Sequence, residues 1–177
     1  MVCCTRCDLA VGRTQVVLGV GAPDAALMFV GEAPGQKEDE AGRPFVGNAG
    51  KLLDKLLTEN RISRDDVFIT NIVACRPPKN RTPRTSEVRA HAPWIDEQIR
   101  LVQPDVVVTL GRIALTYFLP KAKVTQIRGK PQKVRYGESE FLLLPTFHPA
   151  AVLRDYEGMY PKVQADFRKI SKLLKNV

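Results

Sequence analysis

Three cysteines are spaced in a way that suits a metal centre. Cys4 and Cys7 form a Cys-x-x-Cys pair near the start of the sequence, and Cys75 follows about seventy residues later. Such a pair is typical of either a metal site or a redox site. A redox pair stands on the turn after a strand, whereas this pair precedes every strand that the sequence predicts. The spacing therefore favours a metal site with soft sulfur ligands.

Polar residues that could do chemistry follow three apolar segments. The segment Gly31–Gly35 reads Gly-Glu-Ala-Pro-Gly, a tight turn that lets the backbone approach a ligand and from which Glu32 projects. Asn71 lies in an apolar segment, where its amide either bonds to a neighbouring loop or faces the edge of a base. His148 follows another apolar segment and is either a structural or a catalytic residue.

A second glycine-rich loop, at residues 42–47, contains an aromatic residue. Phe45 lies between Pro44 and Gly47, and the acidic pair Glu38 and Asp39 precedes the loop. A phenylalanine in this context is either a plug of the hydrophobic core or a stacking surface for a planar ligand.

Short apolar segments predict buried strands, and helical spacing of apolar residues predicts helices between them. The predicted strands are residues 26–30, 67–73, 105–110 and 141–144. The predicted helices are residues 50–60, 86–102 and 111–119, and a last helix with Val163, Phe167, Ile170 and Leu174 on one face. We expect Ser86 to cap its helix, Pro93 to kink or divide it, and residues 124–134 to form an irregular or edge strand pair.

Near-continuous apolar strands that alternate with helices indicate an α/β protein. A mostly parallel central sheet of four strands, covered by helices on both faces, is the architecture that this pattern favours. We expect one domain over residues 1–177, a three-layer α/β/α sandwich. Ligands bind at the carboxyl ends of the strands in such sheets, so the polar loops should meet at one edge.

The composition is that of a soluble globular domain with a strong positive charge. The 177 residues are 44% hydrophobic and 26% charged, with a net charge of +8. No apolar run approaches the roughly 20 residues that span a bilayer, and the start shows no secretory pattern, so we expect no membrane contact. A basic enzyme often binds a polyanion, although plain solubility also explains the charge.

Four motifs follow each other in an order that resembles one enzyme family. They read Gly-Glu-Ala-Pro-Gly-x-x-Glu-Asp from Gly31, Gly-Arg-Pro-Phe-Val-Gly-x-Ala-Gly from Gly42, Thr-Asn-x-Val-x-Cys-Arg-Pro-Pro-x-Asn-Arg from Thr70, and His-Pro-Ala from His148. Together they resemble the family 4 uracil-DNA glycosylases, iron–sulfur enzymes of prokaryotes. The resemblance runs from about Cys4 to Arg154.

The resemblance implies a base-excision repair enzyme with the uracil-DNA glycosylase fold. Such an enzyme swings deoxyuridine out of the DNA stack and hydrolyses its N-glycosidic bond, which leaves free uracil and an abasic site. By similarity, Phe45 stacks on the uracil, Asn71 reads its Watson–Crick edge, and Glu38 lies near its C5 edge and excludes the thymine methyl group. The turn that contains Gly31, Ala33 and Gly35 holds a uracil oxygen through its backbone.

The resemblance also implies roles in the chemical step. His148 donates a hydrogen bond to the uracil carbonyl, and this bond strengthens as negative charge develops on the leaving base. Glu32 stabilises the cation-like sugar or orients the water. Glu32, Asn71 and His148 are therefore the predicted catalytic residues. Because the turn carries Glu32 and Ala33 where related families carry an aspartate nearby, which group orients the water is left open.

A [4Fe-4S] cluster is the cofactor that the resemblance implies. Cys4, Cys7 and Cys75 match three ligands, and the family's fourth cysteine stands about sixteen residues beyond Cys75, where this chain has His91. His91 is the preferred fourth ligand, since imidazole replaces cysteine in some iron–sulfur centres. Cys3 as the fourth ligand and an open fourth iron are the alternatives. A zinc ion held by three cysteines and one histidine also satisfies these ligand types.

DNA contacts are expected beyond the His-Pro-Ala motif. Leu153 is either a wedge that fills the gap left by the extruded base or a core residue of a helix, and Arg154 and Arg81 are candidate phosphate contacts. Further candidates are Arg13, Lys51, Arg76, Lys79 and Arg84. We expect a monomer in the prokaryotic cytoplasm, associated with the nucleoid, that acts on uracil-containing DNA, with replication or repair proteins as further partners.

Two other functions compete with this one. A relative that binds uracil-DNA with weak or no turnover would carry an added basic loop with a reactive histidine, and residues 81–89 contain none. A zinc-stabilised module that binds nucleotides or a protein partner would be colourless, whereas an iron–sulfur protein is brown.

Overall fold

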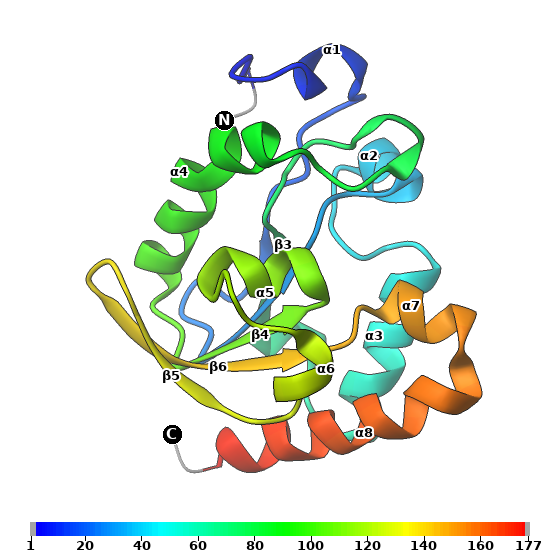
Figure 1. Cartoon of the computed structure of the whole chain (residues 1–177), viewed down its shortest axis with the longest axis vertical. Helices are drawn as coiled ribbons and strands as arrows, with labels where there is room; N and C mark the ends of the chain where they lie inside the picture. Colours follow the sequence, from blue (N-terminus) through cyan, green and yellow to red (C-terminus); the bar gives the residue numbers. More distant parts are fainter. Residues whose placement is uncertain (1–2, 176–177) are drawn as a thin grey trace.

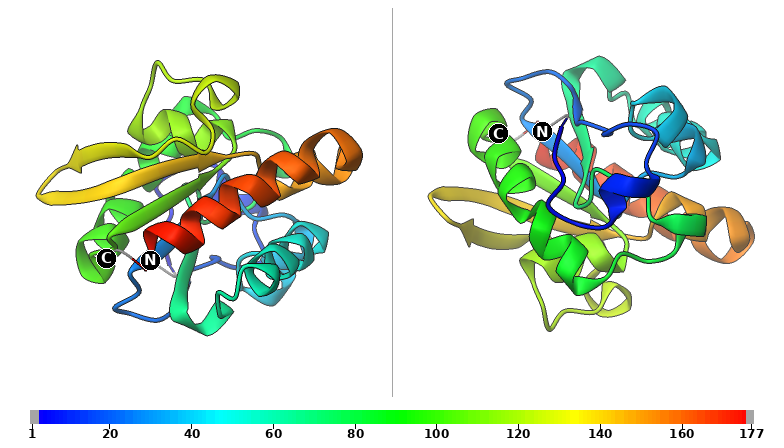
Figure 2. Two further views of the ribbon diagram at one scale, coloured as in Figure 1. Left: turned by 90° about the horizontal axis from the view of Figure 1, so that it is seen from below. Right: turned by 90° about the horizontal axis from the view of Figure 1, so that it is seen from above.

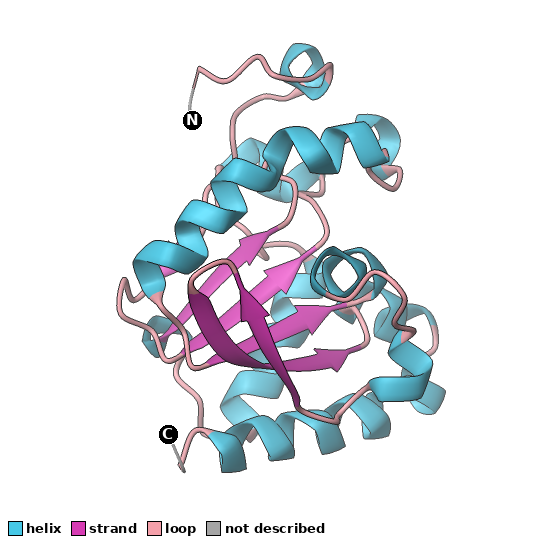
Figure 3. Ribbon diagram, turned by 60° about the vertical axis from the view of Figure 1, so that its left-hand side comes forward, coloured by secondary structure: helices cyan, strands magenta, loops and turns pink. Residues whose placement is uncertain are grey.

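Four buried strands run parallel in the middle of a six-stranded sheet. This computed structural model describes residues 3–175, so the first two and last two residues of the predicted domain lie outside the described residues. The sheet order is β1-β3-β2-β4-β6-β5 (Figures 1 and 3). The strands are β1 (Val20–Gly21), β2 (Leu27–Gly31), β3 (Val67–Asn71), β4 (Val106–Leu110), β5 (Gln132–Tyr136) and β6 (Ser139–Thr146).

The four strands that the sequence predicts form the parallel centre of the sheet, but the prediction of only four strands is wrong. β1 and β5 add one antiparallel strand at each edge. β1 is two residues long, too short to produce a hydrophobic period, and only Val134 of β5 is buried. The expected strand pair over residues 124–134 is in fact a short helix followed by β5, which pairs with β6.

Helices cover both faces of the sheet. In chain order the helices are α1 (Leu9–Gly12), α2 (Gln36–Ala41), α3 (Asn48–Glu59), α4 (Thr85–Val102), α5 (Arg112–Phe118), α6 (Val124–Ile127), α7 (Pro149–Arg154) and α8 (Tyr156–Leu173), with short 3-10 helices at Arg64–Asp66 and Pro78–Asn80. Figure 2 shows α8 lying across one face when the molecule is seen from below. Among residues 3–175, none of the helices is both long and apolar enough to cross a membrane.

Alternating residues of each central strand enter two separate cores. Met28 and Val30 of β2 pack in a cluster with residues of α4 and α5, whereas Leu27 and Phe29 pack with residues of α3 and α8. Successive side chains of a strand point to opposite faces, so a strand that is buried on both faces reads as a continuous apolar run. This explains why the central strands are evident in the sequence.

Helix α4 differs from its prediction in two details. Of the two outcomes expected at Pro93, a kink or a division, the division is wrong, because the helix is continuous through the proline. Its buried face, with Ile95 and Ile99, stays packed on the sheet beyond it. Its N-cap is Arg84 and not Ser86, because the Glu87 carboxylate accepts the backbone N–H of Arg84 at 2.6 Å.

The parallel register brings the polar loops together. Gly31 at the end of β2 pairs with Asn71 at the end of β3, and β6 ends at Thr146, two residues before His148. Strands β3, β2, β4 and β6 run in the same direction, so all their carboxyl ends lie at one edge of the sheet. The expected convergence of the three loops is thereby confirmed.

Phe167 should be essential for the attachment of α8. Its ring stacks on Phe29 of β2 at 5.7 Å between centroids, and both side chains are fully buried. We expect Phe167→Ala to lower the free energy of unfolding by about 3–5 kcal/mol, measured by chemical denaturation. Leu101→Ala, at a residue that is 62% exposed, should change it by less than about 0.5 kcal/mol. Equal losses in the two variants would contradict this packing.

Candidate active site

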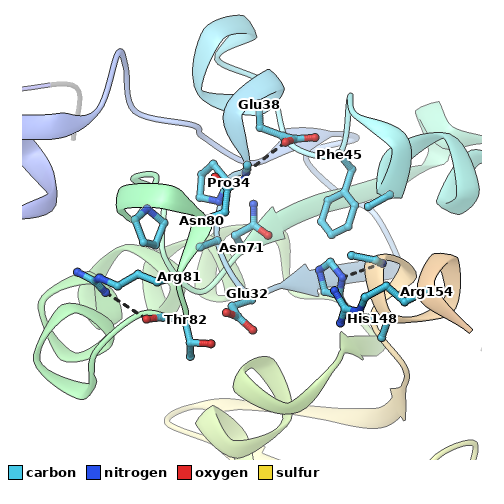
Figure 4. Close-up of a pocket in the computed structure, with 16 residues that line it drawn as sticks. Glu32, Pro34, Glu38, Phe45, Asn71, Asn80, Arg81, Thr82, His148 and Arg154 are labelled. Atoms are coloured by element: carbon cyan, nitrogen blue, oxygen red, sulfur yellow. Dashed lines mark hydrogen bonds between the residues drawn. The ribbon is translucent and has the colours of Figure 1, made fainter.

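The loops that follow β2, β3 and β6 surround one cavity of about 460 Å³. In Figure 4, Phe45 and His148 lie on one side, Asn80 and Arg81 lie on the other, and Asn71 lies between them. The residues that line it are Glu32, Ala33, Pro34, Gly35, Glu38, Phe45, Ala49, Asn71, Pro77, Asn80, Arg81, Thr82, His148, Ala150, Ala151 and Arg154.

The Asn71 side chain is buried in the cavity wall with an unused acceptor. It is 4% exposed, and its Oδ1 atom has no hydrogen-bond partner among the residues that the structure describes. A Cβ atom on Gly31 would lie 2.3 Å from this Oδ1 and 2.7 Å from the Phe45 ring, so only glycine leaves room for both side chains. A buried unpaired acceptor costs about 1–3 kcal/mol. Asn71 also lines the cavity, so its amide group stands in the wall that a ligand would meet.

Phe45 is held in a conformation that non-glycine residues rarely adopt. Its φ is 52°, in the left-handed region. The Arg64 guanidinium donates to the carbonyl oxygens of Pro44 and Phe45, both at 3.1 Å. A Cβ on Gly50 would lie 1.9 Å from the Phe45 carbonyl oxygen, so this glycine permits the close approach. The ring belongs to the core, as one of the two interpretations of the sequence expected, and it also lines the cavity; its stacking on a planar ligand stays a prediction.

The Glu38 carboxylate fastens the two glycine-rich loops to each other. It accepts backbone N–H groups from Gly35 at 3.1 Å, Val46 at 3.0 Å and Gly47 at 2.7 Å. Hydrogen bonds to a carboxylate are stronger than neutral ones, and two of these go to the two residues that follow Phe45. Glu38 therefore lines the cavity and also fixes the position of the Phe45 ring.

His148 is a neutral hydrogen-bond donor at the cavity wall. It caps α7, where its Nδ1 accepts the backbone N–H of Ala150 at 3.1 Å, so the ring proton is on Nε2. Burial, helped by the Arg154 charge and opposed by Glu38, lowers the pKa of His148 to about 4. Its ring lies 5.8 Å from that of Phe45, centroid to centroid.

Glu32 supplies a carboxylate on the floor of the cavity. Burial raises the pKa of its carboxyl, and the Arg112 guanidinium and the Thr82 hydroxyl oppose this rise. The backbone next to it is fixed, because the Glu32 carbonyl accepts the N–H of Val73 at 3.0 Å. Burial thus disfavours the charged form of this carboxyl, and Arg112 and Thr82 favour it.

Two of the DNA-contact candidates, Arg154 and Arg81, line the cavity but differ in their partners. Arg154 lines the cavity, and Leu153 beside it is 43% exposed at the end of α7, so its alternative as a core residue is wrong. The Arg81 guanidinium is engaged by both oxygens of Glu87, at 2.8 and 2.6 Å, and this pairing holds the pKa of Glu87 at about 2.

Two residues that line the cavity, and two that act on its lining residues, have roles that the sequence did not reveal. Thr82 and Asn80 line the wall opposite His148, and Arg112 acts on Glu32 from the start of α5. Arg112 follows β4 directly, so the rule that loops at carboxyl ends converge could have indicated it. Arg64, which holds the Phe45 loop, lies far from any motif and gave no signal.

The three cysteines of the predicted metal site lie near each other, away from the cavity. Burial raises the pKa of the Cys75 thiol, and Cys7 and Cys4 lie close enough to add to this rise. Arg13 Nη1 donates to Cys75 Sγ at 3.2 Å, and Cys7 packs against the core cluster that contains Cys75. Cys3 is exposed.

Three neighbouring thiols are a set of donors that suits either zinc or an iron–sulfur cluster. Within residues 3–175, no three Cys, His, Asp or Glu side chains are close enough together to hold one metal ion. Tetrahedral zinc needs every sulfur at about 2.3 Å from one point. An iron–sulfur cluster takes its thiolates on separate irons, so its ligands stand farther apart.

Comparisons with a family model and with individual proteins indicate the same enzyme family. Residues 18–175 match the family model described as the uracil DNA glycosylase superfamily. A type-4 uracil-DNA glycosylase of Sulfurisphaera tokodaii is 46% identical over 98% of this chain and 81% of that protein. One of Thermotoga maritima is 44% identical over 97% of this chain and 90% of that protein. A DNA polymerase of Bacillus phage SP01 is 31% identical over 88% of this chain but only 16% of the polymerase.

The protonation of His148 can be measured directly. We expect it to stay neutral, with its proton on Nε2, through the range near pH 6.5 where an ordinary histidine titrates. Nitrogen-15 NMR of histidine-labelled protein, assigned with His148→Asn, reports both the pKa and the tautomer. Titration of His148 near pH 6.5 would contradict this description.

The same pKa shift predicts a dependence of stability on pH. The unfolded chain binds a proton on His148 near pH 6.5 and the folded chain only near pH 4, so the unfolded state binds more protons between these values. The free energy of unfolding should therefore fall as the pH is lowered from 6.5 towards 4. Denaturation curves of the wild type and His148→Asn should show a smaller fall for the variant.

Proposed function

Because the chain belongs to the uracil-DNA glycosylase superfamily, we propose that it removes uracil from DNA. The reaction is hydrolysis of the N-glycosidic bond of deoxyuridine, which releases uracil and leaves an abasic site. The observation that carries this proposal is the buried Asn71 amide, with its Oδ1 unpaired, in the wall of a cavity that also presents an aromatic ring and a neutral imidazole. The base has to leave the duplex to reach it, at a cost of a few kcal/mol.

Asn71 would recognise the base through its Watson–Crick edge. Uracil presents an N3–H donor beside the O4 acceptor, so Asn71 Oδ1 accepts from N3–H and Nδ2 donates to O4. Cytosine presents an acceptor at N3 and a donor at its amino group, which opposes both bonds. A buried amide that is left unpaired disfavours the wrong base strongly.

Phe45 would provide the stacking surface for the extruded ring. Stacking of a base on an aromatic side chain contributes about 1–3 kcal/mol and does not depend on the identity of the base. Glu38 and Arg64 support this surface, since they bind the backbone on both sides of Phe45. The resemblance places Glu38 near C5 of the base, where a fixed loop would also leave no room for the thymine methyl group.

His148 would stabilise the departing base. Its Nε2–H donates to a uracil carbonyl oxygen, and that hydrogen bond strengthens as the N-glycosidic bond breaks and negative charge develops on the base. The low pKa supports this role, because the imidazole needs no change of protonation at neutral pH. The backbone N–H of Ala150 donates to Nδ1, so Nε2 is the nitrogen that carries the proton and is left to donate to the base.

Glu32 would act on the sugar. The sugar becomes cation-like as the bond breaks, and a carboxylate nearby lowers the energy of that state. Arg112 and Thr82 support the charged form of Glu32 against its burial. The same carboxylate is a hydrogen-bond acceptor for the attacking water.

We further propose that Cys4, Cys7 and Cys75 bind an iron–sulfur cluster. Its contribution would be structural, because the hydrolysis moves no electrons. Held in this way, the N-terminal segment would be fastened to the loop after β3, which carries Pro77, Asn80 and Thr82 into the cavity wall.

Leu153 and Arg154 would contact the DNA. An exposed leucine at the end of α7 is suited to fill the gap that the base leaves, and a neighbouring arginine to bind a phosphate. The net charge of +8 supports association with a polyanion.

Asn71→Ala should separate activity from stability. The Oδ1 of Asn71 has no partner in the free protein. Removal of the Asn71 amide should therefore leave the free energy of unfolding unchanged or higher. The kcat/KM for uracil release from a uracil-containing oligonucleotide should fall by about 100-fold, because the base edge loses its partners.

Asn60→Ala is the matched control for this variant. Asn60 is also buried, but its Nδ2 donates to the Leu56 carbonyl at 2.7 Å, far from the cavity. Its replacement should cost about 1 kcal/mol of stability and leave excision unchanged. Full activity of Asn71→Ala, or no strand cleavage at abasic sites with the wild type, would refute the proposed function.

A further inference from the structure

We propose that His91 is the fourth protein ligand of the cluster, through Nε2, so that the centre is held by three thiolates and one imidazole. This proposal rests on the iron–sulfur cofactor proposed above. Four features support it: the packing of the cysteine segment on α4, the position of Arg13, the orientation of the imidazole, and the accessibility of the competing cysteine.

The Cys-x-x-Cys segment packs on the turn of α4 that carries His91. The guanidinium of Arg6, which lies between Cys4 and Cys7, stands 5.1 Å from the centre of the Trp94 ring. Trp94 follows His91 by three residues on α4, so the two side chains share one face of the helix. The segment that supplies two thiols therefore lies against the face that presents the imidazole. Figure 1 shows the segment around α1 above the start of α4.

Arg13 links His91 to the third cysteine. Its guanidinium donates to Cys75 Sγ at 3.2 Å, and the same charge acts on the His91 ring. His91 is 3% exposed. One arginine thus contacts the thiol directly and is close enough for its charge to act on the imidazole.

The orientation of the His91 ring leaves Nε2 available. Among residues 3–175, the only hydrogen bond of this imidazole joins Nδ1 to the Glu87 carbonyl oxygen at 2.8 Å. A carbonyl accepts, so Nδ1 carries the proton and Nε2 keeps its lone pair. Histidines that bind metals donate their other nitrogen in this way, most often to a carboxylate or a backbone carbonyl. Arg81 and Arg84 bind the Glu87 side chain and hold this first turn of α4 in place.

Cys3 is the weaker candidate for the fourth position. It is exposed, and it adjoins Cys4, so both thiols would have to reach separate irons from neighbouring residues. An imidazole also carries no negative charge. A cluster with one histidine should therefore have a higher reduction potential than one with four cysteines.

Isotope labelling gives a direct test, because the chain contains only two histidines. Purified protein labelled with nitrogen-15 histidine is brought to the paramagnetic state of the cluster and measured by pulsed electron paramagnetic resonance. We expect a strong nitrogen-15 coupling that persists in His148→Ala, where His91 is the remaining histidine, and disappears in His91→Cys. An intact cluster without this coupling, or a coupling that survives in His91→Cys, overturns the proposal.

Substitutions at His91 and Cys3 test ligation by His91 separately from the presence of the cluster. His91→Cys should retain the cluster and lower its reduction potential, whereas His91→Ala should lose iron faster to a chelator and Cys3→Ser should match the wild type in both respects. An unchanged potential in His91→Cys, or loss of the cluster in Cys3→Ser, contradicts ligation by His91. Wild-type protein that is purified and reconstituted without binding iron and sulfide refutes the cofactor itself.

Discussion

The close approach of Asn71 to Gly31 is the constraint on which the site depends. Parallel pairing of β2 and β3 sets these two residues opposite each other at the carboxyl edge of the sheet, and the missing Cβ of Gly31 leaves the space that the Asn71 amide and the Phe45 ring occupy. The amide is thereby fixed in a buried position with its Oδ1 unpaired. The fold stores this cost, on the order of 1–3 kcal/mol, and binding of the right base recovers it.

The surrounding loops hold the recognition surface rigid before any base arrives. Phe45 keeps a left-handed backbone that costs about 1–3 kcal/mol, and Glu38 and Arg64 stabilise it from two separate elements. The tautomer of His148 is also fixed before a base binds, because the Ala150 N–H donates to Nδ1 and leaves the proton on Nε2. Preorganised donors do not have to reorient when charge develops, so they stabilise the transition state more than the ground state.

The sequence predicts the centre of this molecule better than its edges. The strands buried on both faces are continuous apolar runs, and their parallel order was enough to predict that Asn71 and His148 would meet. The prediction for residues 124–134 was wrong because an edge strand with one buried residue shows almost no alternation of apolar and polar residues. The role of Glu38 depends on backbone amides eight and nine residues away, and the conformation of Phe45 on Arg64, so neither could be derived from local pattern.

The central claim is that Asn71 Oδ1 accepts a hydrogen bond from N3–H of the extruded base. Single-stranded oligonucleotides with deoxyuridine or N3-methyldeoxyuridine at one position test it most directly, since the methyl group removes that donor and leaves the glycosidic bond in place. We predict release of uracil from the first oligonucleotide and at least about 100-fold slower release of the methylated base from the second. Equal rates from both oligonucleotides would contradict the account.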